Sequence, residues 1–274
     1  AIVSVDLTPW NLNDLRVYQS WLPWLRHGWF PAADPMWQYP PGVAPALTLA
    51  DWLPLSFRWG FTTTMLVADA LILAAILTAH ARRADSSWRG PWLWASAGVV
   101  VGSILLARFD LLPTLLAVIA VLLACAPVRP LLSGAAAGLG TLVKVWPVLL
   151  LLVLPRRALA RGAAAAGAVV VVVLAGTALA TTGSLSFLHN QGARGLQLES
   201  VGALPYLLAA RLSGRHLPTV LEYGSIQVDR PGTEAVGLLV TDVGALVLGA
   251  IAFLRLRGRL EAVPPGDLAL ALVL

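Results

Sequence analysis

Long apolar segments that carry almost no charge constrain the fold of this chain more than any other feature. Residues 59–79, 163–182 and 236–254 each contain at most one ionisable side chain. About 20 apolar residues suffice to cross the hydrocarbon core of a bilayer as a helix. Only 12% of the 274 residues are charged, whereas soluble domains carry about a quarter. The sequence therefore predicts an all-α polytopic membrane protein.

The apolar segments alternate with large polar sections, which gives the expected organisation of the chain. Spanning helices are predicted at 59–79, 92–107, 111–125, 163–182 and 236–254, with another starting near 267. Within one transmembrane domain, 1–274, we expect an outward loop at 1–58, a helix bundle at 59–182, a second outward loop at 183–235 and further helices at 236–274. Tryptophan favours the membrane interface, so the five tryptophans of residues 1–41 predict short surface helices. Residues 43–55 are apolar but too short to span, which indicates an interfacial helix.

Positive charge sets the expected orientation. Ten arginines lie in four short connections, at 80–90, 126–130, 155–162 and 255–267. Positive residues in short loops mark the cytoplasmic side, so both large polar sections are expected to face outward from a plasma membrane. This alternation requires the apolar run 131–154 to turn back on itself. Lys144 and Pro147 lie in its middle, and proline breaks a helix, so two half-length helices with Lys144 at their outward tip are predicted. One kinked helix is the alternative.

Several classes of protein and site are excluded by composition. The single cysteine, Cys125, rules out an internal disulfide and a cysteine-based metal cluster. Membrane orientation explains the arginines, so no nucleic acid partner is expected, and no His/carboxylate spacing predicts a metal or another cofactor. Because the chain starts at Ala1 and ends in an apolar stretch, 267–274, that is too short to span, we expect it to be an internal piece of a longer protein.

The first polar section offers two acids and an aromatic motif. Asp14, in "NDLRVY", could act as a general base toward a hydroxyl group. Alternatively, Asn13 or Asp14 could cap the helix that follows, and local sequence favours the cap. Asp34 is a second candidate acid, although it also fits a turn. In "WQYPPG", the two prolines predict a rigid lead into the interfacial helix, and Tyr39 could stack on a sugar ring.

Charges also occur between apolar segments, where lipid makes them costly. Arg108 and Asp110, in "RFDLLP", join two predicted helices and could pair with each other or line the outer rim of a substrate pocket. Lys144 could neutralise a phosphate or extend to the interface. Asp69 lies in mid-helix, where it is expected to pair with a cation from a neighbouring helix.

The second polar section contains "RGLQLES", residues 194–200. Arg194 suits bidentate phosphate recognition, and Glu199 adds a carboxylate close by. A solvated loop helix is the competing interpretation. His189 is ambiguous between a binding and a structural role.

Taken in order, five motifs resemble those of the bacterial polyprenyl-phosphate-mannose-dependent alpha-mannosyltransferases, glycosyltransferase family 87, which are membrane enzymes of the GT-C type. The motifs are "DLRVY" at 14–18, "YPP" at 39–41, "RFDLLP" at 108–113, "GLGTLVKVWPVLLL" at 138–151 and "RGLQLES" at 194–200. The resemblance covers roughly residues 14–254.

The resemblance implies a GT-C-like helix bundle whose active site lies on the outer face of the membrane. It implies a polyprenyl-phosphate sugar donor, a lipid or glycolipid acceptor and inverting transfer, with mannose as the expected sugar and an arabinofuranose as another. Asp14 matches the aspartate base of the first loop, which reverses the preference for a cap. Arg108, Lys144 and Arg194 match the motif cations, and Asp110, Tyr39, Glu199 and His189 complete the expected substrate-binding set.

A polytopic transporter or lipid-carrier flippase is the competing function. Such proteins contain broken helices with charges at mid-depth, as at Lys144 and Pro147. Two outward sections rich in Trp, Asp and Arg favour chemistry outside the membrane instead.

Overall fold

The computed structural model describes residues 11–82, 88–125, 127–192, 195–222 and 225–273. These residues form two compact units. The first comprises residues up to 31 together with 39–185 and 261–274, and the second comprises 32–38 and 186–260.

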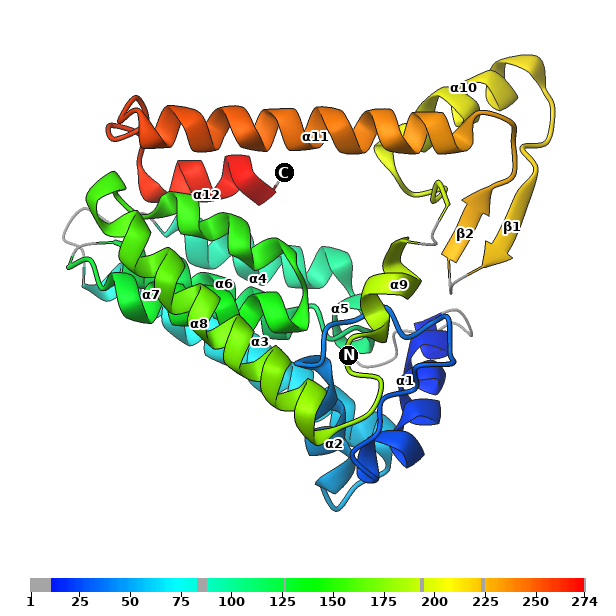
Figure 1. Ribbon diagram of the computed structural model, residues 1–274, viewed down its shortest axis with the longest axis horizontal. Coiled ribbons are helices and arrows are strands. Elements are labelled where there is room, and N and C mark those ends of the chain that lie inside the picture. Colours follow the sequence, from blue (N-terminus) through cyan, green and yellow to red (C-terminus); the bar gives the residue numbers. More distant parts are fainter. Residues whose placement is uncertain (1–10, 83–87, 126, 193–194, 223–224, 274) are drawn as a thin grey trace. The chain divides into compact units, whose positions relative to one another are not determined.

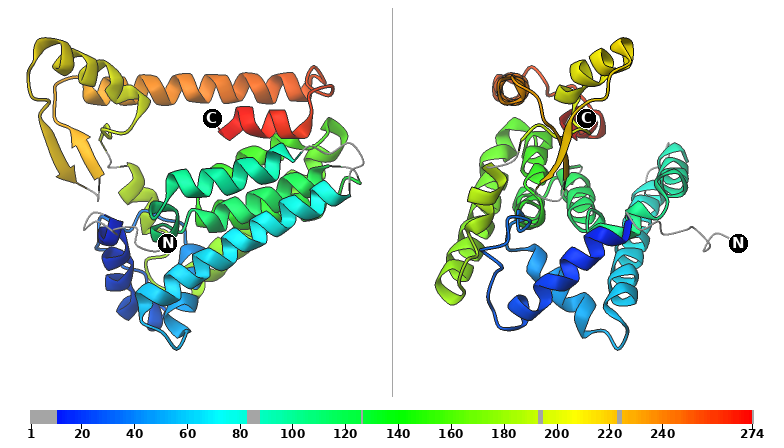
Figure 2. Two further views of the ribbon diagram at one scale, coloured as in Figure 1. Left: turned by 180° about the vertical axis from the view of Figure 1, so that it is seen from behind. Right: turned by 90° about the vertical axis from the view of Figure 1, so that its right-hand side faces the viewer.

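The regular elements of the first unit, in its described part, are all helices (Figure 1). Its elements are α1 (Asn11–Arg26), α2 (Val43–Trp52), α3 (Phe57–Ala81), α4 (Arg89–Val101), α5 (Ile104–Ala107), α6 (Leu111–Ala124), α7 (Pro130–Val143), the 3-10 helix η1 (Trp146–Val153), α8 (Arg156–Ala180) and α12 (Pro265–Val273). Helix α3 contacts α6, α6 contacts α7, and α7 contacts α8. The right view of Figure 2 shows α8 (yellow-green) on one side of this row and α3 (cyan) on the other. Asp110 precedes α6 and Lys144 follows α7, so two helices of this row position charged residues of the candidate site.

Small residues allow α7 and α8 to approach closely. A Cβ atom built on Gly134 would lie 2.0 Å from the backbone oxygen of Gly162, and one on Gly138 would lie 2.8 Å from that of Ala166. Each pair of small residues is four positions apart on its helix, which is the spacing that lets membrane helices pack backbone to backbone. Helix α6 is joined to α7 by a hydrogen bond of 2.8 Å from the Ser133 hydroxyl to the Ala120 carbonyl.

Three helices in the described ranges are long and apolar enough to span a membrane: α3, α8 and α11 (Thr233–Leu256). They agree with the spans predicted at 59–79, 163–182 and 236–254. The predicted span 92–107 is wrong as a single helix. Helix α4 ends at Val101, Gly102 adopts φ +62°, and α5 follows as one separate turn. Glycine reaches positive φ without the steric cost of a Cβ, which explains the break.

The predicted break in 131–154 is present. Helix α7 ends at Val143, Lys144 is extended, and η1 begins at Trp146. Pro147 lies in the first turn of η1, and a Cβ on Gly140 would meet its ring at 2.9 Å. The second half therefore folds back against the first, as two short segments rather than one kinked helix.

The second unit contains the elements α9 (Ser186–Gly192), η2 (Val201–Ala203), α10 (Leu204–Ser213), β1 (Thr219–Glu222), β2 (Ser225–Val228) and α11. Strands β1 and β2 pair antiparallel, with Thr219 opposite Val228 and Glu222 opposite Ser225; Figure 1 shows them as two arrows. The all-α prediction is wrong at this hairpin. Strand β1 reads Thr-Val-Leu-Glu, with its two apolar residues next to each other, so it lacks the alternation of apolar and polar residues that marks a strand in a sequence.

Candidate active site

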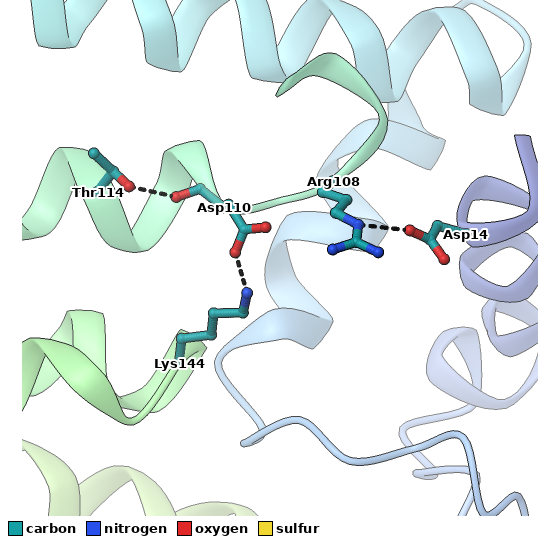
Figure 3. Close-up of polar contacts among 5 residues, drawn as sticks. All are labelled: Asp14, Arg108, Asp110, Thr114 and Lys144. Atoms are coloured by element: carbon teal, nitrogen blue, oxygen red, sulfur yellow. Dashed lines mark hydrogen bonds and ion pairs between the residues drawn. The ribbon is translucent and has the colours of Figure 1, made fainter. Parts of the chain in front are cut away.

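Four charged side chains from three parts of the first unit form two ion pairs (Figure 3). The Arg108 Nε donates to Asp14 Oδ2 at 2.8 Å. The Lys144 Nζ donates to Asp110 Oδ1. Asp14 comes from the first turn of α1, Lys144 follows the end of α7, and Arg108 and Asp110 lie in the connection from α5 to α6. Residues 94 and 34 positions apart in sequence are thereby brought into contact.

Phe109 anchors the segment that carries Arg108 and Asp110. Its side chain is buried, with a residue exposure of 2%. The ring lies 5.4 Å from that of Tyr18 and 4.7 Å, edge-on, from that of Tyr39. Aromatic pairs at such separations contribute about 0.5–1.5 kcal/mol each beyond their buried area. Packing of Phe109 therefore fixes the two charged neighbours between α1 and α7.

The backbone at this segment directs the charges to different partners. Arg108 is extended, with φ −122° and ψ 146°, whereas Asp110 already has helical dihedrals and occupies the N-cap position of α6. The Asp110 carboxylate does not cap the helix and instead accepts from Lys144; its backbone oxygen accepts from the Thr114 hydroxyl at 2.7 Å. Figure 3 shows Arg108 directed toward Asp14 and Asp110 toward Lys144. Arg108 and Asp110 do not pair with each other.

Residues 39–42 border the same cluster. Besides Phe109, the Tyr39 ring contacts that of Trp21, with centroids 6.0 Å apart. The backbone N–H of Gly42 donates to the carbonyl of Leu142 at 2.9 Å, and a Cβ on Gly42 would lie only 2.5 Å from that oxygen. The "YPPG" segment thus lies directly against the end of α7 that carries Lys144.

The four charged side chains are partly exposed. The side chains are 31% exposed for Asp14, 45% for Arg108, 40% for Asp110 and 35% for Lys144. Among the described residues, Arg108 uses one of its five N–H groups, and Asp14 Oδ1 accepts no hydrogen bond. Both residues therefore retain hydrogen-bonding capacity for a ligand.

The electrostatic environment keeps Tyr18 neutral and Arg108 charged. Burial raises the pKa of the Tyr18 phenol well above its usual range, and Tyr39, Asp14 and Asp110 raise it further. Burial acts to lower the pKa of the Arg108 guanidinium, but the charge and hydrogen bond of Asp14, with Tyr18 and Asp110, raise it overall. The cluster therefore holds a fixed cation beside two carboxylates and a neutral phenol.

Asp14 does not cap α1, because the helix begins at Asn11 and Asp14 lies within its first turn. Asp69 accepts a hydrogen bond of 2.9 Å from the Trp94 indole. The expectation that it pairs with a cation is wrong, since an uncharged donor satisfies the carboxylate.

The remaining predicted residues that the structure describes belong to the second unit. His189 and Glu199 are exposed residues of the second unit, and Arg194 lies outside the described residues. Asp34, also in the second unit, accepts at Oδ1 from the backbone N–H of Met36, as expected for a turn residue. The Asn190 side chain, in α9, donates to the backbone oxygens of Asp34 and Trp37. These two hydrogen bonds hold the turn at Asp34 against α9 within the second unit.

Two residues that organise the site were missed from the sequence. Tyr18 and Phe109 both lie inside the quoted motifs, as the last residue of "DLRVY" and the second of "RFDLLP". The presence of an aromatic residue within each charged motif could have indicated that these two residues pack beside the charges.

Three comparisons with known proteins complete the description. Residues 37–274 match the profile of glycosyltransferase family 87. No curated protein and no solved structure matches. The match includes Arg108, Asp110 and Lys144, whereas Asp14 precedes it. Because the match covers most of the sequence, the chain belongs to glycosyltransferase family 87, and with its three apolar helices it is a membrane glycosyltransferase.

Proposed function

We propose that the protein transfers a mannosyl group from a polyprenyl-phosphate donor to a lipid or glycolipid acceptor at the outer face of the plasma membrane, with inversion at the anomeric carbon, on a GT-C-type bundle. The observation that carries this proposal is the four-charge cluster of Asp14, Arg108, Asp110 and Lys144. It combines a carboxylate that can accept a proton with two cations that can bind a phosphate, at a partly open surface.

Asp14 is the proposed general base. It takes the proton of the acceptor hydroxyl while that oxygen bonds to the anomeric carbon. The bond from the anomeric carbon to the phosphate oxygen breaks, and polyprenyl phosphate leaves with the electron pair. Attack and departure on opposite faces of the sugar ring give inversion.

Arg108 and Lys144 are the proposed phosphate ligands. Cations directed at the oxygen where negative charge develops lower the barrier of the reaction. In the resting site each is paired with a carboxylate, so the four formal charges cancel. The donor phosphate would bind the N–H groups of Arg108 that Asp14 does not use. It would thereby compete with Asp14 for the guanidinium and leave the Asp14 carboxylate available as a base.

The other predicted residues have supporting roles. Tyr39 would stack on the sugar or the adjoining isoprene unit beside the cluster. His189, Arg194 and Glu199 stay predicted contacts for donor or acceptor. The Trp-rich segment and α2 would border the lipid chain of the donor.

The test compares two aspartates that are each paired with an arginine in the first unit. Asp51 binds Arg26 through Nε at 2.7 Å and Nη2 at 2.6 Å, so Asp51→Asn is a matched control for Asp14→Asn. Membranes of cells that make the full-length protein are incubated with radiolabelled polyprenyl-phosphate-mannose and a lipid extract as acceptor. Loss of a general base should lower transfer by about 10²–10⁴-fold, whereas the control variant should retain it.

Equal transfer by Asp14→Asn and wild type, at equal expression, would refute the base assignment and direct the search to Asp34. The transporter alternative predicts a different result. The protein would move the lipid-linked sugar across a vesicle membrane, would lose that movement when Asp69 or Lys144 is changed, and would tolerate Asp14→Asn.

A further inference from the structure

A groove in the first unit lies between α3 and α6, at the ends of these helices remote from Phe57 and Leu111. Its volume is about 560 Å³, within the range of about 300–1,000 Å³ that is typical of ligand pockets. Leu71, Ala75 and Thr78 line it from α3, four and three positions apart and so on one helix face, and Ile119 and Leu122 line it from α6. The groove is separate from the four-charge cluster, none of whose residues lines it.

The burial of the two helices explains why the groove opens there. Every buried residue of α3 lies between Phe57 and Ile72, and none lies in its last nine residues. Small side chains, Ala74, Ala75 and Ala79, occupy the α3 side of the groove. Helix α6 turns its buried alanines to α7, as at Ala120. The face left between α3 and α6 is therefore apolar and unfilled by protein.

Two arginines stand at this groove. Arg82 follows α3, and Arg129 precedes α7; both line the cavity and both are exposed. Within the described part of the chain neither forms an ion pair. Both belong to the connections at 80–90 and 126–130, which the positive-inside pattern assigns to the cytoplasmic side.

We propose that this groove binds an anionic diacyl phospholipid of the cytoplasmic leaflet. The acyl chains would lie along the leucine and alanine side chains, and Arg82 and Arg129 would bind the phosphate. Basic pockets between membrane helices on the cytoplasmic side are suited to anionic headgroups, and that leaflet supplies them. The proposal does not depend on the reaction that the protein catalyses.

The only cysteine of the sequence provides the test, because Cys125 lines the groove. Full-length protein, with cysteines outside the present sequence replaced, is placed in vesicles of phosphatidylcholine alone or of phosphatidylcholine and phosphatidylglycerol in equal amounts. The rate of Cys125 labelling by a maleimide is measured in each. Phosphatidylglycerol should slow the labelling, and phosphatidylcholine should not.

The arginine contribution is measured with the double variant Arg82→Gln/Arg129→Gln. Each basic residue at an anionic surface contributes about a factor of five in affinity. In the double variant, the phosphatidylglycerol content that halves the labelling rate of Cys125 should therefore rise about 30-fold. The matched control is Arg157→Gln/Arg161→Gln, which removes the same charge from two exposed arginines of α8 that do not line the groove. It should retain the wild-type protection.

Three results would overturn the proposal: equal labelling in both vesicles, unchanged protection in the Arg82/Arg129 variant, or stronger protection by polyprenyl phosphate than by phosphatidylglycerol. The wild-type comparison requires no variant, so a folding defect in the variant would not obscure the first or third result.

Discussion

Gly134 tests the close packing of α7 on α8, which positions the end of α7 that carries Lys144. In Gly134→Ala, the new Cβ would lie 2.0 Å from the oxygen of Gly162 and 2.7 Å from its carbonyl carbon. Both are backbone atoms, so no side-chain rotation can relieve the contact. Because real Cβ contacts are essentially never below 3.0 Å, the two helices must separate by about 1 Å, and overpacking of this kind costs about 1–3 kcal/mol.

That cost predicts a measurable loss of thermal stability. With about 2–4 °C of midpoint change per kcal/mol, the melting temperature of the detergent-solubilised protein should fall by roughly 2–12 °C. Gly138→Ala, whose Cβ would meet the Ala166 oxygen at 2.8 Å, should show a smaller fall.

Gly167→Ala is the control on the same helix pair. Nothing lies within 4 Å of a Cβ at this position of α8, and alanine forms helix more readily than glycine by up to about 1 kcal/mol. Its melting temperature should equal or exceed that of wild type. A Gly134→Ala protein that melts with wild type, or a Gly167→Ala protein that falls as far, would refute the packing described for α7 and α8.

Two further predictions concern single side chains. The raised pKa of Tyr18 means that its stabilising contribution is complete below about pH 10, the ordinary pKa of tyrosine, and is lost as pH rises through the higher value of the folded state. Melting temperatures measured from about pH 8 to 11 should therefore fall more for wild type than for Tyr18→Phe; identical profiles would contradict the burial of the phenol. Trp94→Phe removes the donor to Asp69 and should cost about 1–3 kcal/mol in unfolding experiments. Trp92→Phe, at a residue 70% exposed, should cost little, and equal losses would argue against the hydrogen bond.

The sequence predicted the helices whose existence depends on local composition. Helices α3, α8 and α11 follow from long apolar runs with at most one ionisable residue each, because a helix satisfies its own backbone within lipid. The break at Lys144 follows from Pro147, which cannot donate a backbone hydrogen bond. The division at Gly102 and the hairpin at 219–228 escaped prediction. One depends on a single glycine in an apolar run, and the other on two four-residue strands, the first of which is exposed along its whole length.

The sequence by itself also determined which residue types were available for chemistry, since charges beside apolar segments are costly and few. Only the tertiary structure decided their partners. Asp14 and Arg108 are 94 positions apart, and the only ion pair that local sequence suggested for Arg108 was one with Asp110. The buried ring of Phe109 settles the choice, because its packing against Tyr18 and Tyr39 directs one neighbour to α1 and the other to the end of α7. Motif residues are a property of the chain, whereas their pairing is a property of the packing that holds them.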